Sequence, residues 1–168
     1  MAINFPEGTQ NFPAHRVPRL LVEERPGSTA SQTNGHMVFA STSGATRYNT
    51  NNHLLIEGGC LWDGNNPNGY WVVQYSSDNS NWSDVAPVFE ADEDTSGSGD
   101  VNWFAFSFKH DPGTASTYYY RLYWYHWQQN GGTMYRNRPR NQQNWSRTYT
   151  DGPNGGTYIN IYELLDFQ

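Results

Sequence analysis

The sequence predicts an all-β fold, and three observations support this prediction. First, 16% of the 168 residues are Phe, Tyr or Trp, while 36% are hydrophobic and 15% charged; disordered chains are poor in aromatic residues, so we expect a folded chain. Second, helix-forming residues are scarce, with Lys109 the single lysine, whereas residues typical of strands and tight turns are abundant. Third, short β-rich runs alternate with clusters of Gly, Asn, Ser and Asp, a spacing typical of a sandwich or barrel.

The expected strands follow an N-terminal arm. Residues 1–16 contain Pro6 and Pro13 and lack an apolar period, so we expect an extended arm there and a single domain over residues 17–168. Val17–Arg25 is expected to form an edge strand, because Pro18 within it and Pro26 after it cannot donate hydrogen bonds to a neighbouring strand. Further strands are expected, in order, at His36–Ser41, Thr46–Thr50, His53–Trp62, Tyr70–Ser77, Trp82–Glu90, Val101–Lys109, Thr117–Gln128, Thr133–Arg138, Trp145–Thr150 and Thr157–Leu165.

Two turns predict antiparallel hairpins. The residues of Asp78-Asn79-Ser80-Asn81 tolerate left-handed backbone and bond their own main chain, so we expect the strands on either side of them to pair. The run Gln129-Asn130-Gly131-Gly132 contains Asn-Gly, the strongest short hairpin signal. We therefore expect it to join Thr117–Gln128 to Thr133–Arg138 in a second hairpin.

Length, cysteine content and charge exclude several classes of protein. A chain of this length buries roughly 70% of the surface that its unfolded state exposes, so a core can form without disulfides, and Cys60 has no second cysteine as a partner. No apolar run approaches the roughly 20 residues of a membrane span, and residues 1–15 lack the segments of a signal peptide. The net charge of −6 disfavours nucleic acid and anionic membranes as partners. We expect a soluble protein that binds neither.

The predicted strand Thr117–Gln128 has aromatic residues on both faces. Side chains alternate between the two faces of a strand. One face carries Tyr118, Tyr120, Leu122, Trp124 and His126, and the other carries Tyr119, Arg121, Tyr123, Tyr125 and Trp127. One face must pack in the core, and the sequence does not say which. For the other face three interpretations are open: tyrosine hydroxyls that face solvent, contact with another subunit, or a platform on which sugars stack.

An acidic run over residues 90–100 matches the first half of a calcium-binding loop. Asp92, Asp94 and Asp100 stand where oxygen ligands are needed, but Trp103 occupies the place of the bidentate glutamate. We therefore expect an acidic surface loop, with the three aspartates as weak candidates for a metal site. A later segment contains four arginines and no acid, and it either pairs with the acidic loop between copies or faces solvent. Its arginines are Arg136, Arg138, Arg140 and Arg147.

Enzyme signatures are absent in the forms that one sequence can test. The nucleophile-elbow, zinc-protease and phosphate-loop patterns are missing, and the five histidines lie far apart. Cys60 follows two glycines in an apolar run, so we expect a small buried residue and not a nucleophile. Glu57 and Glu163 are weak candidates for a hydrolytic pair. We expect a protein that is not an enzyme and needs no cofactor.

Both ends of the chain resemble known proteins. The start, MAINFPEGTQN, resembles the openings of small structural proteins of tailed bacteriophages. The end, from 117–123 through 131–133 to 157–164, resembles the last strands of trimeric phage heads with a tumour-necrosis-factor-like jelly roll. The resemblance implies an antiparallel jelly-roll sandwich that forms a homotrimer and belongs to the virion.

The resemblance also implies contact surfaces. The last strand would pack near the threefold axis, and the implied trimer interface consists of Tyr119, Arg121, Tyr123, Tyr125, Trp127, Tyr158, Asn160 and Tyr162. The arm would reach a major capsid protein or another virion protein through Ile3, Phe5, Pro6, Phe12 and Pro13. We expect a capsid decoration (cement) protein that stabilises the shell. The alternative is the head of a tail or head fibre that binds a host surface carbohydrate, with candidates Trp62, Trp71, Trp82 and Trp145.

Overall fold

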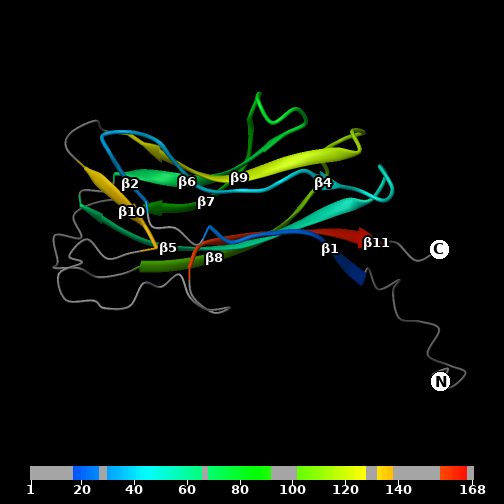
Figure 1. The fold of residues 1–168 in the computed structure, drawn as a ribbon, viewed down its shortest axis with the longest axis horizontal. Helices are drawn as coiled ribbons and strands as arrows, with labels where there is room; N and C mark the ends of the chain where they lie inside the picture. The colour runs from blue at the N-terminus through cyan, green and yellow to red at the C-terminus, as the bar shows by residue number, and fades with distance from the viewer. Residues whose placement is uncertain are drawn as a thin grey trace, which may run out of the picture.

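The structure is a sandwich of two antiparallel β-sheets (Figure 1). The computed structural model describes residues 17–26, 30–65, 68–91, 102–127, 132–137 and 156–165. These residues form strands and turns, and the predicted all-β sandwich is confirmed. None of them belongs to a helix long and apolar enough to cross a membrane. The predicted arm over residues 1–16 lies outside the described residues.

Sheet A is built around one long strand, β5 (His53–Asn65). On one side of β5, its first half pairs with β11 (Tyr158–Leu165) and its last residues pair with β10 (Thr133–Arg136). Beyond these two strands lie β1 (Val17–Glu24), next to β11, and β2 (Ala30–Thr33), next to β10. The other side of β5 pairs with β8 (Asn102–His110) along the whole of β8.

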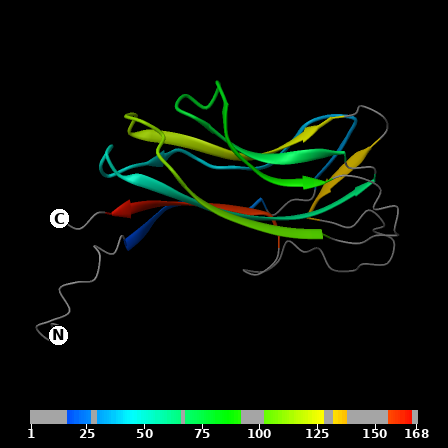
Figure 2. The same ribbon diagram turned by 180° about the vertical axis from the view of Figure 1, so that it is seen from behind.

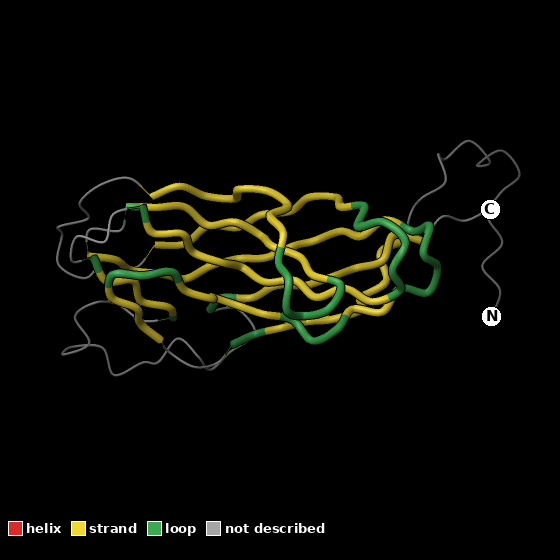
Figure 3. The backbone as a smooth tube through the Cα atoms, turned by 90° about the horizontal axis from the view of Figure 1, so that it is seen from above, coloured by secondary structure: helices red, strands yellow, loops and turns green. Residues whose placement is uncertain are grey.

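Sheet B is centred on β9 (Thr117–His126). One side of β9 pairs with β3 (Met37–Ser41) and with the short β4 (Ala45–Thr46). The other side pairs with β6 (Gly69–Ser76), and β7 (Ser83–Ala91) lies beyond β6. The two sheets lie one above the other when the molecule is seen from the side (Figure 2), and their strands run roughly along its long axis (Figure 3).

The core between the sheets is rich in aromatic side chains. Trp71 lies within this core, and its ring centroid is 4.2 Å from that of Trp124 and 4.8 Å from that of Trp62. From sheet A, Ile159 and Ile161 of β11 are fully buried against this cluster. The even-numbered face of β9 is therefore the core face, with the buried residues Tyr118, Tyr120, Leu122, Trp124 and His126.

Two adjacent glycines of β5 make room for rings from β8. A Cβ atom on Gly58 would lie 2.2 Å from the Phe106 ring, and one on Gly59 would lie 2.4 Å from the Trp103 ring. Real Cβ atoms do not approach other heavy atoms so closely, so a side chain at either position would displace a ring. Because successive residues of a strand face opposite ways, the Phe106 ring packs over Gly58 on the inner face of sheet A and the Trp103 ring packs over Gly59 on the outer face.

The hairpin predicted between β6 and β7 is confirmed. Asp78 Oδ1 accepts hydrogen bonds of 2.8 Å from the backbone N–H groups of Asn81 and Ser80. Asn79 adopts a left-handed backbone with φ of 59°, as the turn requires. The hydrogen bonds from Asn81 and Ser80 hold the pKa of Asp78 far below its ordinary value.

The hairpin predicted between β9 and β10 is wrong. β9 belongs to sheet B, whereas β10 pairs with β2 and β5 in sheet A, so the chain crosses from one sheet to the other. An Asn-Gly pair favours a tight turn, but it does not select the partner of the strand that follows. β2 itself was not predicted, because Ala30–Thr33 is polar and mostly exposed.

The strand predicted over Thr46–Thr50 ends at Thr46. The next residue, Arg47, is buried, and its guanidinium donates hydrogen bonds to the carbonyl oxygens of Asn52 (2.9 Å), Gly113 (2.5 Å) and Ala115 (2.6 Å). These contacts tie the loop after β4 to the residues that immediately precede β9. The sequence did not indicate them because an arginine in a β-rich run is more often exposed.

The Glu163 carboxylate fixes the same loop from sheet A. It accepts hydrogen bonds from the backbone N–H groups of Tyr48 (2.9 Å) and Asn49 (3.0 Å) and from the Asn52 amide (2.9 Å). Burial acts to raise the pKa of Glu163, but these hydrogen bonds outweigh it and hold the pKa below its ordinary value. The loop between β4 and β5 is thereby tied to β11.

Candidate interaction surface

The outer face of sheet B carries a row of aromatic side chains. The odd-numbered residues of β9 point away from the core, because their even-numbered neighbours fill it. Rings that flank β9 on both sides extend the row. We name this set the aromatic ladder, and its members are Trp82, Arg121, Tyr123, Tyr125, His36, Tyr70 and Trp127.

Neighbouring members of the aromatic ladder contact one another directly. The guanidinium carbon of Arg121 lies 4.2 Å from the Trp82 ring centroid and 4.5 Å from that of Tyr123. The rings of Tyr123 and Tyr125 meet edge to face at 4.9 Å, and Tyr125 stacks on Tyr70 at 5.1 Å. Each aromatic pair contributes about 0.5–1.5 kcal/mol beyond the burial of its area. The rings therefore hold one another in defined positions.

One end of the aromatic ladder is the most accessible to a partner. Trp127 is 52% exposed, and its ring centroid lies 5.9 Å from that of Tyr70. His36 is exposed as well and meets the Tyr125 ring edge to face at 5.2 Å. Its Nδ1 accepts a hydrogen bond of 3.2 Å from the backbone N–H of His126, which orients the imidazole.

A buried glutamine anchors the aromatic ladder from below. Gln74 accepts a hydrogen bond of 2.6 Å from Arg121 Nε, and its amide donates to Asp84 Oδ1 at 2.7 Å and to the Tyr125 hydroxyl at 2.8 Å. Burial lowers the pKa of Arg121, although Tyr123, Tyr125 and Asp84 act to raise it. Burial, and next the charge of Asp84, raise the pKa of Tyr125. One buried side chain therefore holds both the Arg121 guanidinium and the Tyr125 hydroxyl in place.

The structure divides the predicted trimer interface between two surfaces. The five residues of the set that lie on β9 or just after it, including Tyr119, share the outer face of sheet B. Tyr158, Asn160 and Tyr162 point outward from sheet A, because Ile159 and Ile161 point into the core. The two groups therefore lie on opposite sides of the sandwich.

The surface on sheet A has a smaller aromatic cluster of its own. Trp103 is 48% exposed and stacks on Tyr158 with 6.1 Å between ring centroids, and the Arg25 guanidinium lies 5.2 Å from the same Tyr158 ring. Asn160 is only 9% exposed; its amide donates to the Tyr162 hydroxyl at 3.3 Å. These three residue pairs do not form a continuous row like the one on sheet B.

Several predicted sites lie outside the described residues. Among them are the contact residues of the arm, the three candidate metal ligands, three of the four arginines and one predicted strand. They are Ile3, Phe5, Pro6, Phe12, Pro13, Asp92, Asp94, Asp100, Arg138, Arg140, Arg147 and Trp145–Thr150. Arg136 is described, and its guanidinium donates to the carbonyl oxygens of Val38 and Phe39.

Two of the tryptophans proposed for sugar stacking are core residues. Trp62 and Trp71 are buried and pack against each other between the sheets, so the prediction that they are exposed is wrong. Alternation along a strand separates its two faces but does not say which one is buried. A tryptophan combines a large apolar ring with one N–H donor, so it can lie on either face of a sheet. Trp82 lies on the outer face beneath the Arg121 guanidinium.

The candidate hydrolytic pair is not assembled. Glu57 lies opposite the outward-pointing Asn160 in the β5–β11 register, whereas Glu163 points inward, so the two carboxylates lie on opposite faces of sheet A. Both oxygens of Glu163 already accept backbone N–H groups. The interpretation of Glu57 and Glu163 as a hydrolytic pair is therefore wrong.

Cys60 is a buried core residue, as predicted. Its side chain is inaccessible to solvent, and the Thr157 hydroxyl is its hydrogen-bond donor at 3.8 Å. Burial raises the pKa of the Cys60 thiol well above its ordinary value, which disfavours the reactive thiolate. Among the described residues, no three His, Cys, Asp or Glu side chains gather as a metal site would require.

Sequence reasoning missed four residues that build the surface on sheet B. Alternation within Tyr70–Ser77 places Tyr70 and Gln74 on one face, but nothing in the sequence indicates that this face continues that of Tyr123 and Tyr125. That depends on the register in which β6 pairs with β9. The missed residues are His36, Tyr70, Gln74 and Asp84.

Comparison with known proteins gives no match for this chain. No family model fits the sequence, and neither a curated protein nor a solved structure is significantly similar to it. A function must therefore be argued from the surface itself.

Proposed function

We propose that this protein is a structural component of a bacteriophage virion, a homotrimer that associates through the aromatic ladder and decorates the capsid shell. The observation that carries the proposal is the ladder, an ordered and partly exposed aromatic row on an outer sheet face. The resemblance of both chain ends to phage structural proteins supplies the virion and the threefold symmetry. Its partners would be its own copies and a major capsid protein or another virion protein.

The composition of the aromatic ladder suits contact between proteins. Tyr, Trp and Arg are the residues enriched at binding hot spots. Rings that are already fixed by their neighbours lose little conformational entropy when a partner covers them. The polar groups below are paired as well, since Gln74 bonds Arg121, Asp84 and Tyr125. Burial of this surface would leave few polar groups without partners, which keeps the cost of desolvation low.

Threefold symmetry narrows the interface to one of the two surfaces. In a closed ring each copy uses two different surfaces. The outer faces of the two sheets point in opposite directions, and contact between them would produce an open row of copies instead of a ring. We therefore infer that the aromatic ladder of one copy contacts an edge of the next sandwich, and that Tyr158, Asn160 and Tyr162 lie outside the trimer interface.

The mass of the protein under native conditions tests the proposal. The parent chain is expected to form trimers, and Tyr123→Asp or Tyr125→Asp is expected to abolish this threefold association, because each would bury a charge without a partner. Tyr162→Asp introduces the same change on the opposite face and should leave the trimer intact. A monomeric parent at micromolar concentration, or a trimer that survives both ladder variants, would overturn the trimer. The intact trimer is also expected to sediment with capsid shells.

A second candidate function is supported by the exposed end of the aromatic ladder. Trp127 is 52% exposed and lies beside Tyr70. Asp84 and Arg121 supply polar groups along the same face. Such a surface suits the apolar face and hydroxyls of a sugar, as a fibre head that binds a host carbohydrate would need. Titration of glycans with tryptophan fluorescence as the readout tests it. Binding that is lost in Trp127→Ala and retained in Trp103→Ala would favour this function over capsid decoration.

A further inference from the structure

Among the edge strands of the described chain, β8 is the one long strand that contains neither a proline nor a bulge, although it carries Lys109. Natural edge strands avoid pairing with another strand by being short, by carrying proline or a charged residue such as lysine, or by bulging. β1 contains Pro18 and a bulge, and β7 contains Pro87 and two bulges. β3 is bulged, and β2 and β4 have four and two residues. β8 has nine residues, no proline and no break in register with β5.

We propose that β8 pairs antiparallel with β8 of a second copy, with the Phe106 residues of the two copies opposite each other. This register pairs all nine residues of each strand. It places Phe104 opposite Phe108 of the other copy on the inner face, and Ala105 opposite Ser107 on the outer face. A shift of the centre by one residue would leave two residues of each strand without an opposite residue.

Charge favours the same register. Lys109, the single lysine of the chain, lies outward on β8 and is placed opposite Trp103 of the other copy, where an ammonium can approach the indole ring. Trp103 is 48% exposed in the single chain. Registers that bring the two lysines opposite each other are disfavoured, because like charges directly across a strand pair repel.

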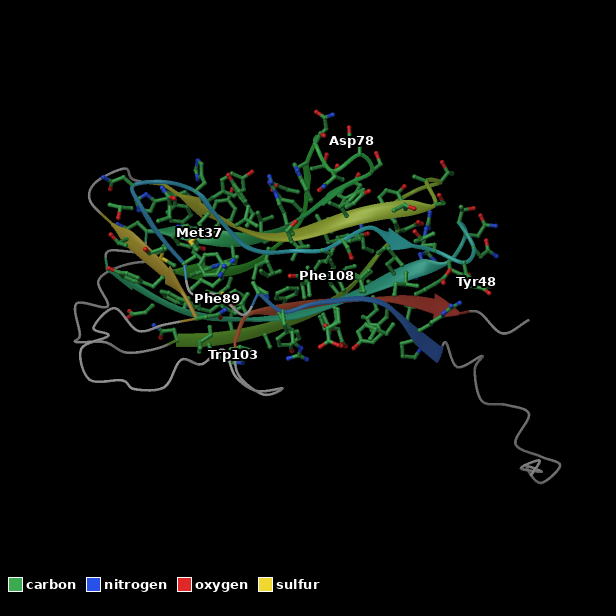
Figure 4. All side chains as sticks on the ribbon, viewed as in Figure 1. Met37, Tyr48, Asp78, Phe89, Trp103 and Phe108 are labelled. Atoms are coloured by element: carbon green, nitrogen blue, oxygen red, sulfur yellow. The ribbon has the colours of Figure 1, made fainter. Side chains whose placement is uncertain are left out.

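The shape of the sandwich beside β8 also fits a twofold contact. β7 contacts β8 near the start of β8, where the Phe89 and Phe104 rings stack with 4.7 Å between centroids. Towards the end of β8, Phe106 and Phe108 are only partly buried, and Figure 4 shows Phe108 between the sheets with Trp103 on the outer side. Antiparallel pairing places the covered half of one strand beside the open half of the other. The second copy would thus shield the part of the core that β7 leaves accessible.

This contact is independent of the aromatic ladder, which lies on sheet B. β7 and β8 form one lateral side of the sandwich, and the opposite side, with β1 and β3, remains for contacts within a trimer. Trimers that join through β8 would form a larger assembly. Within the proposed virion role, the inference adds a contact between trimers, but it does not depend on that role.

Two variants that each add one cysteine, Ala105→Cys and Ser107→Cys, test the register. Both positions are exposed and point outward, whereas the native Cys60 is inaccessible to solvent. Mild oxidation of a mixture of the two variants should give a disulfide-linked dimer, because position 105 faces position 107 of the other copy. Each variant alone should give none, since equivalent Cα atoms would be about 8 Å apart, beyond the reach of a disulfide. Equal cross-linking in the mixture and in the separate variants, or none in the mixture, would overturn the proposal.

A charge exchange tests the contact without a disulfide. In the Tyr125→Asp background, where the ladder contact is disabled, light scattering should report dimers. Trp103→Lys places two lysines opposite each other and should shift these dimers to monomers, and adding Lys109→Glu should restore them. Dimers that persist in Trp103→Lys would overturn the pairing. Trimers without cross-links would reject only the β8 contact, whereas cross-links without trimers would reject only the ladder-mediated trimer.

Discussion

The Asn52 side-chain amide donates a hydrogen bond of 2.9 Å to the buried Glu163 carboxylate, which ties the loop after β4 to the strand β11. Two backbone N–H groups, those of Tyr48 and Asn49, complete the set of donors. The ionised form of Glu163 is therefore bound in the folded state and free in the unfolded chain. Its contribution to stability depends on pH for this reason.

Glu163→Gln should lower the free energy of unfolding at pH 7 by about 1–3 kcal/mol, because the amide cannot accept from all of these donors. The depressed pKa of Glu163 stabilises the fold above the ordinary glutamate pKa of about 4.3. This stability is lost as pH falls through that value towards the pKa of the folded state. Urea titrations between pH 7 and pH 3 should show that the difference between parent and variant shrinks. A difference that stays constant with pH would contradict the prediction.

Gly58→Ala should destabilise the fold by about 1–3 kcal/mol, because the new methyl group would overlap the Phe106 ring and approach the backbone oxygen of Tyr158. Gly35→Ala is the matched control. Its methyl group would meet only the end of the flexible Gln32 side chain, at 3.0 Å, and little loss is expected. Thermal unfolding of both variants measures the difference. Equal losses would show that Phe106 can move aside without cost.

Arg121→Ala should cost about 1–2 kcal/mol of stability, because it removes the cation stacked between Trp82 and Tyr123 and leaves Gln74 Oε1 without its donor. Arg121→Lys should recover little of this loss. An ammonium lacks the planar face that lies along both rings and the fixed N–H that reaches Gln74. Chemical denaturation of the two variants measures the effect. Full recovery by lysine would show that charge alone matters at this position.

Cys60 should resist maleimide in the native protein and react once the core opens, because its side chain is inaccessible to solvent and its thiol pKa is raised. Pulse labelling in increasing urea should follow the same transition as tryptophan fluorescence. Labelling that precedes the fluorescence change would indicate that β5 separates from sheet B before the core around Trp71 is lost.

The sequence was sufficient to predict most strands because alternation and turn residues are local signals. The turn around Asp78 satisfies its hydrogen bonds within four residues, so the hairpin that contains it could be predicted. The partner of β10 could not, since Thr133 pairs with Thr33 and Asn65, both distant in the chain. The two faces of β9 were found from its period, but the choice of the core face depends on how Trp71 and Trp124 meet across strands.

The same limit applies to the aromatic ladder. Tyr123 and Tyr125 were candidates because they share one face of a strand. His36 and Tyr70 join them only through the pairing of β9 with β3 and β6. The sequence did not indicate the role of Gln74, because a glutamine in an aromatic strand can point into solvent as readily as it can lie buried beneath the rings. Long-range register, and not local propensity, assembles this surface.

The position of β11 between β1 and β5 constrains how the chain folds as it leaves the ribosome. β1 pairs with β11 through residues far apart in the chain, such as Val17 with Leu165. The first half of β5 also pairs with β11. β1 cannot find its partner until residues 158–165 have emerged, whereas the β6–β7 hairpin closes within 69–91. Such distant pairing slows folding. The nascent chain should therefore form sheet B contacts first, and β1 and the first half of β5 should stay without their β11 partner until residues 158–165 have emerged, the interval in which a chaperone would matter most.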